Sequence, residues 1–158
     1  MTKEDIKGYT NRIIQANKSE LIVILYDIVL QDLQEAQEYL TESKERDYQK
    51  SCNHCLRAVN ELMVSLDFKY EISVELFRLY RYVNEVIAKA KTTKDASLLA
   101  NAYHTMNKLR TSFIKVASED HSEPVMKNTE QVYAGLTYNK GDLNESLLNA
   151  STNRGFKV

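Results

Sequence analysis

Between Tyr9 and Glu123 the sequence contains neither glycine nor proline. The four glycines and the single proline all lie outside this stretch, nearer to the two ends of the chain. Sheet proteins need tight turns, and tight turns use glycine for positive φ angles or proline for a fixed φ angle. A long stretch without these residues, rich in Leu, Ala, Glu, Lys and Gln, is typical of packed helices. The sequence therefore predicts an all-α core.

The composition of the 158-residue chain excludes several classes of protein. Hydrophobic residues at 43% and charged residues at 27% are typical of one globular domain. The formal charge of -1 leaves no basic excess for binding nucleic acid. The longest apolar run, Leu21 to Tyr26, is too short to cross a membrane. Two cysteines, together with an N-terminus that does not resemble a signal peptide, predict a reducing, cytoplasmic location.

Polar junctions divide the stretch into four expected helices. Asn17 followed by Glu20 has the pattern of a capping box, in which the Asn side chain accepts an N–H and the Glu reaches back. Asp47 is the expected N-cap of the second helix. Four helices of this length with short links should be antiparallel neighbours. The expected helices cover residues 17–40, 47–67, 71–91 and 95–117.

The predicted architecture is an antiparallel four-helix bundle over residues 17–118, flanked by two further segments. Residues 1–16 are weakly apolar and are expected to form an N-terminal capping segment. Residues 119–158 hold the only proline and three of the four glycines, which predicts a mostly extended, flexible tail with one short helix near 144–150. Within the tail, residues 132–138 carry two tyrosines and a leucine, and they are a candidate cover for apolar surface in this or a neighbouring molecule.

The expected helices carry more apolar surface than one core can use. Each has a core stripe, and these stripes include Val29, Leu33, Cys52, Cys55, Ile72, Leu76, Leu79, Leu99, Met106 and Phe113. Residues 21–30 are apolar almost all round, so the first helix has a second apolar surface to cover. Either other parts of the chain cover this surplus, or it forms a groove for apolar helices of another chain. Both alternatives apply if the N-terminal segment covers the groove until a helix of another chain displaces it.

Residues 52–55, with the sequence Cys-Asn-His-Cys, superficially suggest a metal or redox site. Both cysteines fall on the core stripe of their helix, however, whereas His54 points to the opposite side. A structural zinc site needs about four converging ligands, and the sequence has no second Cys/His pair. It also has no Glu-x-x-His pair, glycine-rich phosphate loop or plausible nucleophile and base. We therefore expect no metal, no cofactor and no enzyme activity, and a metal- or small-molecule-binding bundle has little support.

Four blocks of the sequence resemble, in order and spacing, motifs of the FliS family of flagellin export chaperones. Residues 21–27 read LIVILYD, close to the family signature L-I-x-x-L-Y-D. Residues 61–67 and 76–83 are similar to its E-L-x-x-S-L-D and L-x-x-L-Y-x-Y blocks, and residues 109–113 to its final L-R-x-x-W, with Phe113 in place of tryptophan. The usual Pro at the start of the first long helix and the Gly-Gly after the second block are both missing.

The resemblance implies a helical bundle that binds the disordered C-terminal segment of flagellin in the cytosol. Such a chaperone prevents premature polymerisation of flagellin and delivers it to the flagellar export apparatus. The export gate and regulators of flagellin synthesis are further candidate partners, whereas nucleic acid and membranes are not. The alternative is a helical adaptor or oligomerisation module that pairs its extra apolar faces with other helical chains, a second copy in a homodimer included.

The candidate site residues come from two sources. The family motifs give Leu21, Tyr26, Asp27, Leu79 and Tyr82 as client-binding residues. The surplus apolar surface gives Ile24, Ile28, Val64, Phe68, Val74 and Phe77. Ile6 and Tyr9 are expected to occupy the groove when no client is bound.

Overall fold

The computed structural model describes residues 2–126, which form five α-helices. In chain order these are α1 (Lys3–Gln15), α2 (Lys18–Thr41), α3 (Glu45–Val64), α4 (Ile72–Thr93) and α5 (Ala96–Glu119). No strand occurs within residues 2–126, and the all-α prediction is confirmed. The predicted helix near 144–150 and the segment 132–138 lie outside the described residues.

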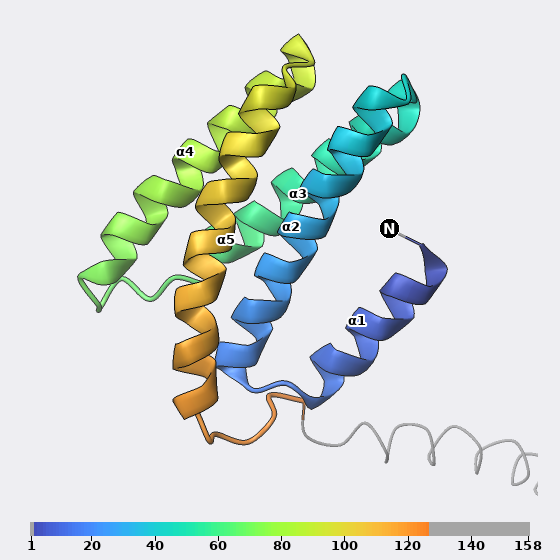
Figure 1. The fold of residues 1–158 in the computed structure, drawn as a ribbon. Coiled ribbons are helices and arrows are strands. Elements are labelled where there is room, and N and C mark those ends of the chain that lie inside the picture. The colour runs from blue at the N-terminus through green and yellow to red at the C-terminus, as the bar shows by residue number, and fades with distance from the viewer. Residues whose placement is uncertain (1, 127–158) are drawn as a thin grey trace, which may run out of the picture. The chain divides into compact units, whose positions relative to one another are not determined.

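Helices α2 to α5 run alternately up and down and pack side by side (Figure 1). Helix α2 packs against α3 and α5, and α4 completes the ring because it also packs against α3 and α5. The shorter α1 lies along the outer side of α2 and runs antiparallel to it (Figure 1). Among the main helix pairs, α2 therefore has more neighbours than any other helix.

Side-chain caps determine where α1 and α2 begin. The predicted capping box is present on α2: the Glu20 N–H donates to Asn17 Oδ1 at 2.8 Å, and the Asn17 N–H donates to Glu20 Oε2 at 2.9 Å. Thr2 and Asp5 form a second capping box at the start of α1. These reciprocal bonds satisfy N–H groups that have no partner within the helix. The N-terminal segment is thus a capped helix of its own.

The start of α3 differs from the prediction. This helix begins at Glu45, and Lys44 precedes it without a side-chain capping bond. The prediction of Asp47 as N-cap is therefore wrong, because Asp47 lies in the first turn of α3. An acidic side chain is favourable there because the N-terminal end of the helix dipole is positive.

The core lies between the four long helices and follows most of the predicted stripes. Buried members include Val29, Leu33, Cys52, Cys55, Leu76, Leu99 and Met106, and Phe113 is partly buried against them. Ile72 differs from its prediction because it is the first residue of α4, at the end of the bundle, and is exposed. Leu79 is also more exposed than a core residue should be, whereas Leu30, outside the predicted stripe, is buried.

Two buried tyrosines meet in the core. The hydroxyl groups of Tyr26 and Tyr80 share a hydrogen bond of 2.5 Å, and the Tyr26 ring packs against Phe113 at a centroid distance of 5.3 Å. Burial raises the pKa of both phenols, so both stay neutral. Because Tyr26 has no exposed surface, it is a core residue in this structure and does not form part of an accessible client-binding surface.

The chain after α5 returns to the junction between α1 and α2. Asn17 Nδ2 donates to the carbonyl oxygen of Asp120 at 2.8 Å, and the N–H of Val125 donates to the carbonyl of Ala16 at 3.0 Å. Ser19 Oγ donates to the Asp120 carboxylate at 2.5 Å, and this bond is the main reason that the pKa of Asp120 falls to about 2. Residues 120–125, which we assigned to the tail, are thus bonded to the rest of the fold.

A buried carboxylate that the sequence analysis missed lies between α2 and α3. The carboxylate of Asp32 is within 2.6 Å of His54 Nδ1, and only 1% of Asp32 is exposed. Burial raises the pKa of Asp32 to about 6, and the hydrogen bond with His54 opposes this rise. His54 does lie away from the buried cysteines of its helix, but there it faces α2 and pairs with Asp32.

This pair predicts a pH-dependent effect of substituting His54. Because the folded-state pKa of Asp32 exceeds that of an exposed Asp, near 4, ionising Asp32 removes stability as the pH rises from about 4 to about 6. The His54 bond offsets part of that loss. We expect His54→Gln to lower the free energy of unfolding by about 1–2 kcal/mol at pH 8 and by clearly less at pH 5, as measured by urea denaturation.

His104→Gln is the matched control for this experiment because His104 is an exposed histidine on α5. It should cost the same small amount of stability at both pH values. An equal loss for His54→Gln at pH 5 and pH 8 would contradict the assignment of a titrating Asp32.

Candidate functional site

Helix α1 covers one face of α2. This face, which we call the lid stripe, consists of Glu20, Ile24, Asp27 and Gln31, residues spaced three and four apart on α2. Tyr9 Oη donates to Gln31 Oε1 at 2.9 Å, and Arg12 Nη2 donates to Asp27 Oδ2 at 2.6 Å. Ile24, between these two polar contacts and the loop, is only 3% exposed. Of the surplus apolar residues predicted for this helix, Ile24 is thus covered by the chain's own N-terminal helix, whereas Ile28 and Leu30 pack with the core.

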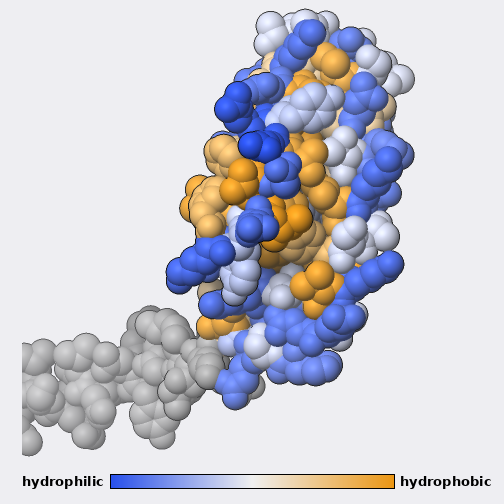
Figure 2. Space-filling view, turned by 90° about the vertical axis from the view of Figure 1, so that its left-hand side faces the viewer, coloured by the Kyte–Doolittle hydropathy of each residue, from blue (hydrophilic) through white to orange (hydrophobic). Residues whose placement is uncertain are grey.

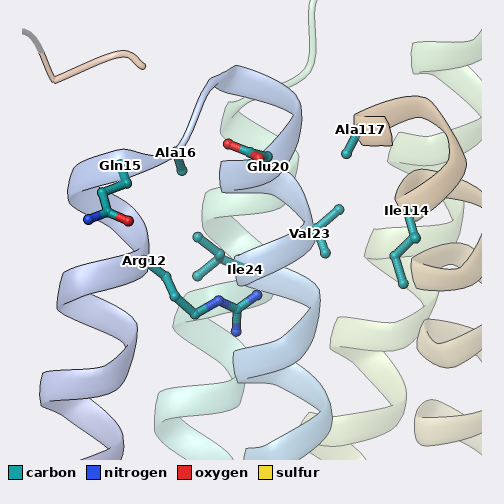
Figure 3. Close-up of a pocket in the computed structure, with 8 residues that line it drawn as sticks. All are labelled: Arg12, Gln15, Ala16, Glu20, Val23, Ile24, Ile114 and Ala117. Carbon is teal, nitrogen blue, oxygen red and sulfur yellow. The ribbon is translucent and has the colours of Figure 1, made fainter. Parts of the chain in front are cut away.

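A pocket of about 360 Å³ remains where α1, α2 and α5 meet (Figure 3). From α2, the Ile24 side chain points towards α1 and the Val23 side chain points towards α5 (Figure 3). The pocket is lined by Arg12, Gln15, Ala16, Glu20, Val23, Ile24, Ile114 and Ala117. A pocket lined by both apolar and polar side chains suits one side of an amphipathic helix.

Helix α1 packs weakly on the lid stripe. Helix α1 has no buried residue, and the side chains of Tyr9 and Arg12 hydrogen-bond it to α2. Of the two predicted capping residues, Tyr9 makes one of these bonds, whereas Ile6 is 54% exposed. A segment with few buried apolar contacts is the part of a fold that opens at low free energy.

A second apolar surface lies on the outer side of α4. This surface, which we call the α4 patch, consists of Phe68, Val74, Phe77 and Tyr82, which line a hollow of about 500 Å³. Phe68 is 58% exposed and Phe77 37% exposed, and their rings meet edge to face at a centroid distance of 5.9 Å. Figure 2 shows apolar side chains gathered and hollowed on this face of the molecule, with hydrophilic residues around them. Arg78, Arg81 and Glu85 supply charged groups at the hollow.

The remaining predicted site residues lie apart from these two surfaces. Val64, at the end of α3, is 81% exposed and does not line the hollow beside α4. Leu79 lies outside the same hollow. Leu21 and Ile28 are partly buried, and Ile28 packs against the core. The structure thus groups Phe68, Val74, Phe77 and Tyr82 on one surface, and Ile24 with Asp27 on the other.

Sequence reasoning missed the polar partners that hold α1 in place. Gln31 Oε1 accepts a hydrogen bond from the Tyr9 hydroxyl, and Arg110 of α5 donates a hydrogen bond to Asp27 Oδ1. Burial is the main cause that raises the pKa of Tyr9, so its hydroxyl remains a hydrogen-bond donor. The sequence could have placed Gln31 on the same face of α2 as Ile24 and Asp27, because the three residues are spaced three and four apart. Arg110 is more than 80 residues away in the chain, and no local pattern connects it to Asp27.

Apolar surface on two faces of a helical bundle, with one face under a lightly held helix, is typical of modules that bind amphipathic segments of another chain. The family described as "Flagellar protein FliS" matches residues 2–120 of this chain. The chain therefore belongs to the FliS family of flagellar export chaperones. Membership implies a role in flagellum biogenesis, with flagellin as the partner.

No curated protein matches the chain significantly. Within residues 2–126, none of the helices has the length and apolar character needed to span a membrane.

Proposed function

We propose that this protein is a cytoplasmic export chaperone that binds the disordered C-terminal segment of flagellin. Binding prevents flagellin from polymerising prematurely, and the complex is delivered to the flagellar export apparatus. The observation that carries this proposal is the apolar surface open on the α4 patch, together with Ile24, which lies under a helix that has no buried residue of its own. Soluble monomers rarely leave such contiguous apolar surface without a partner.

The two surfaces suit a client that is amphipathic and disordered when free. Its apolar side chains, spaced three and four apart, would enter the hollow beside α4 and replace α1 on α2. A disordered client loses conformational entropy when it binds, so the apolar area covered must be large, about 1,000–3,000 Å². Release needs no nucleotide if a competing contact at the export machinery removes the client. The export gate and regulators of flagellin synthesis are the further partners that we propose.

Helix α1 acts as a lid in this proposal. Without a client it covers Ile24 and satisfies Asp27 and Gln31. Because α1 has no fully buried residue, a client that buries more apolar area can displace it at a modest cost in free energy. The measured affinity for the client is then reduced by the fraction of molecules in which the lid is closed.

A second candidate function follows from the exposure of the α4 patch. An adaptor or oligomerisation module would pair this patch with an identical patch on another copy. The two candidates predict different titrations. We expect a flagellin C-terminal peptide to bind tightly at a 1:1 ratio with a negative heat-capacity change in calorimetry. A soluble peptide that produces no heat, together with a concentration-dependent dimer in sedimentation, would favour the adaptor.

Phe77→Asp tests the α4 patch. The substitution places a charge in the hollow next to Phe68, so we expect at least about tenfold weaker binding of the peptide, equivalent to about 1.4 kcal/mol. Helicity should be retained because Phe77 is partly exposed. Ala88→Asp is the matched control, since it adds the same charge at an exposed site on α4 outside the hollow. Loss of helix in circular dichroism would instead assign Phe77 to the core.

Gly8→Ala tests the lid. A methyl group at Gly8 meets no atom within 4 Å, and alanine favours a helix by about 1 kcal/mol over glycine. The closed lid therefore becomes more stable without any new contact to α2. We expect the affinity for the peptide to fall by up to about fivefold in calorimetry. An unchanged affinity would mean that α1 and the client do not compete.

A further inference from the structure

Asp27 connects the lid to the bundle through both of its carboxylate oxygens. Oδ2 accepts from Arg12 of α1 at 2.6 Å, and Oδ1 accepts from Arg110 of α5. The Asp27 side chain is only 12% exposed, whereas that of Arg12 is 48% exposed. The carboxylate is therefore a mostly desolvated group whose charge is divided between one cation on the lid and one cation on the bundle.

The two cations differ in what happens when the lid opens. Arg110 belongs to a helix that packs in the bundle, so it stays with Asp27. Arg12 leaves with α1, and Oδ2 then loses its charged donor. Water can solvate this oxygen while the lid stripe is open. A helix that covers Ile24 would exclude that water again and leave Oδ2 without a partner, which is costly for a charged acceptor.

We propose that Asp27 selects the segment that replaces the lid, by requiring an Arg or Lys side chain at the position of Arg12. This inference rests on the proposed function and specifies the chemistry of the client. The lid supplies the pattern: Tyr9 faces Gln31 and Arg12 faces Asp27, so a donor precedes the cation by three residues. Arg12 also lies over the Tyr9 ring, 5.6 Å from its centroid, which orients the guanidinium towards α2.

The same direction applies to the client. Because α1 runs antiparallel to α2, a client helix in its place would present an amide or hydroxyl donor to Gln31 and, three residues later, a cation to Asp27. Apolar side chains on the same face would cover Ile24 and Val23. A purely apolar or acidic helix would be disfavoured, because it leaves one carboxylate oxygen desolvated and unpaired.

The competing explanation is that Asp27 only fastens the lid. On that view, breaking the Arg12–Asp27 pair from either side opens the lid and strengthens client binding to the same extent. If Asp27 also binds the client, the two sides differ. Removal of the arginine frees Asp27 for the client, whereas removal of the carboxylate frees the lid but deletes the client's anchor. Substituting the two partners of this one ion pair therefore changes the affinity to different extents.

The experiment compares three full-length variants by calorimetry with a flagellin C-terminal peptide that contains basic residues. Arg12→Gln and Tyr9→Phe both loosen the lid without altering the carboxylate, and we expect each to bind the peptide about two- to tenfold more tightly than the unmodified chain. Asp27→Asn should bind it at least about tenfold more weakly than Arg12→Gln. Equal strengthening by Arg12→Gln and Asp27→Asn would overturn the proposal.

A second measurement does not depend on the folding of any variant. The unmodified chain is titrated with the same peptide after its Arg and Lys residues are replaced by Gln. We expect this neutral peptide to bind the unmodified chain at least about tenfold more weakly than the basic one does. Equal affinity of both peptides for the unmodified chain would overturn the role of Asp27 and leave the proposed function intact. If neither peptide binds, the proposed function itself fails.

Discussion

Helix α2 needs cover on every side, and the arrangement of the other helices follows from this requirement. Its inner face joins the core through Val29 and Leu33, and α3 and α5 pack on its flanks. On its outer face, the apolar side chain of Ile24 would be exposed without α1. A four-helix ring cannot surround one of its own members, so the fifth helix supplies the missing cover. The packing of α1 is thus a consequence of the apolar residue that α2 carries on its outer face.

The lid stripe and the α4 patch differ in whether a client helix can reach them in the structure. The α4 patch is open, and its Phe68–Phe77 pair is accessible without any rearrangement. The lid stripe is covered, and the chain protects it with contacts that are mainly polar. These hydrogen bonds fix the position of α1 on α2, and because α1 has no fully buried residue, it can still detach. Asp27 couples this opening to the bundle because Arg110 shares the same carboxylate.

Local patterns predicted the parts of the fold that depend on neighbours in sequence. The capping box of Asn17 and Glu20 was predictable because both halves lie within one helical turn. The burial of Cys52 and Cys55 followed from their place on an apolar stripe. The burial of Tyr26 was not predictable from its own helix, because it depends on Tyr80 and Phe113, which come from two other helices. The Asp32–His54 pair was missed for the same reason, since each residue alone resembles a surface residue of its helix.

The sequence by itself determined the helical class, the helix order and the existence of surplus apolar surface, because helix periodicity and the absence of glycine and proline act locally. Only the tertiary structure decided which part of that surplus is covered. Ile24 and Phe77 are both apolar residues outside a predicted core stripe, yet one lies under α1 and the other faces solvent. That difference depends on where α1 packs, which is set by polar contacts between residues far apart in the chain, such as Tyr9 with Gln31.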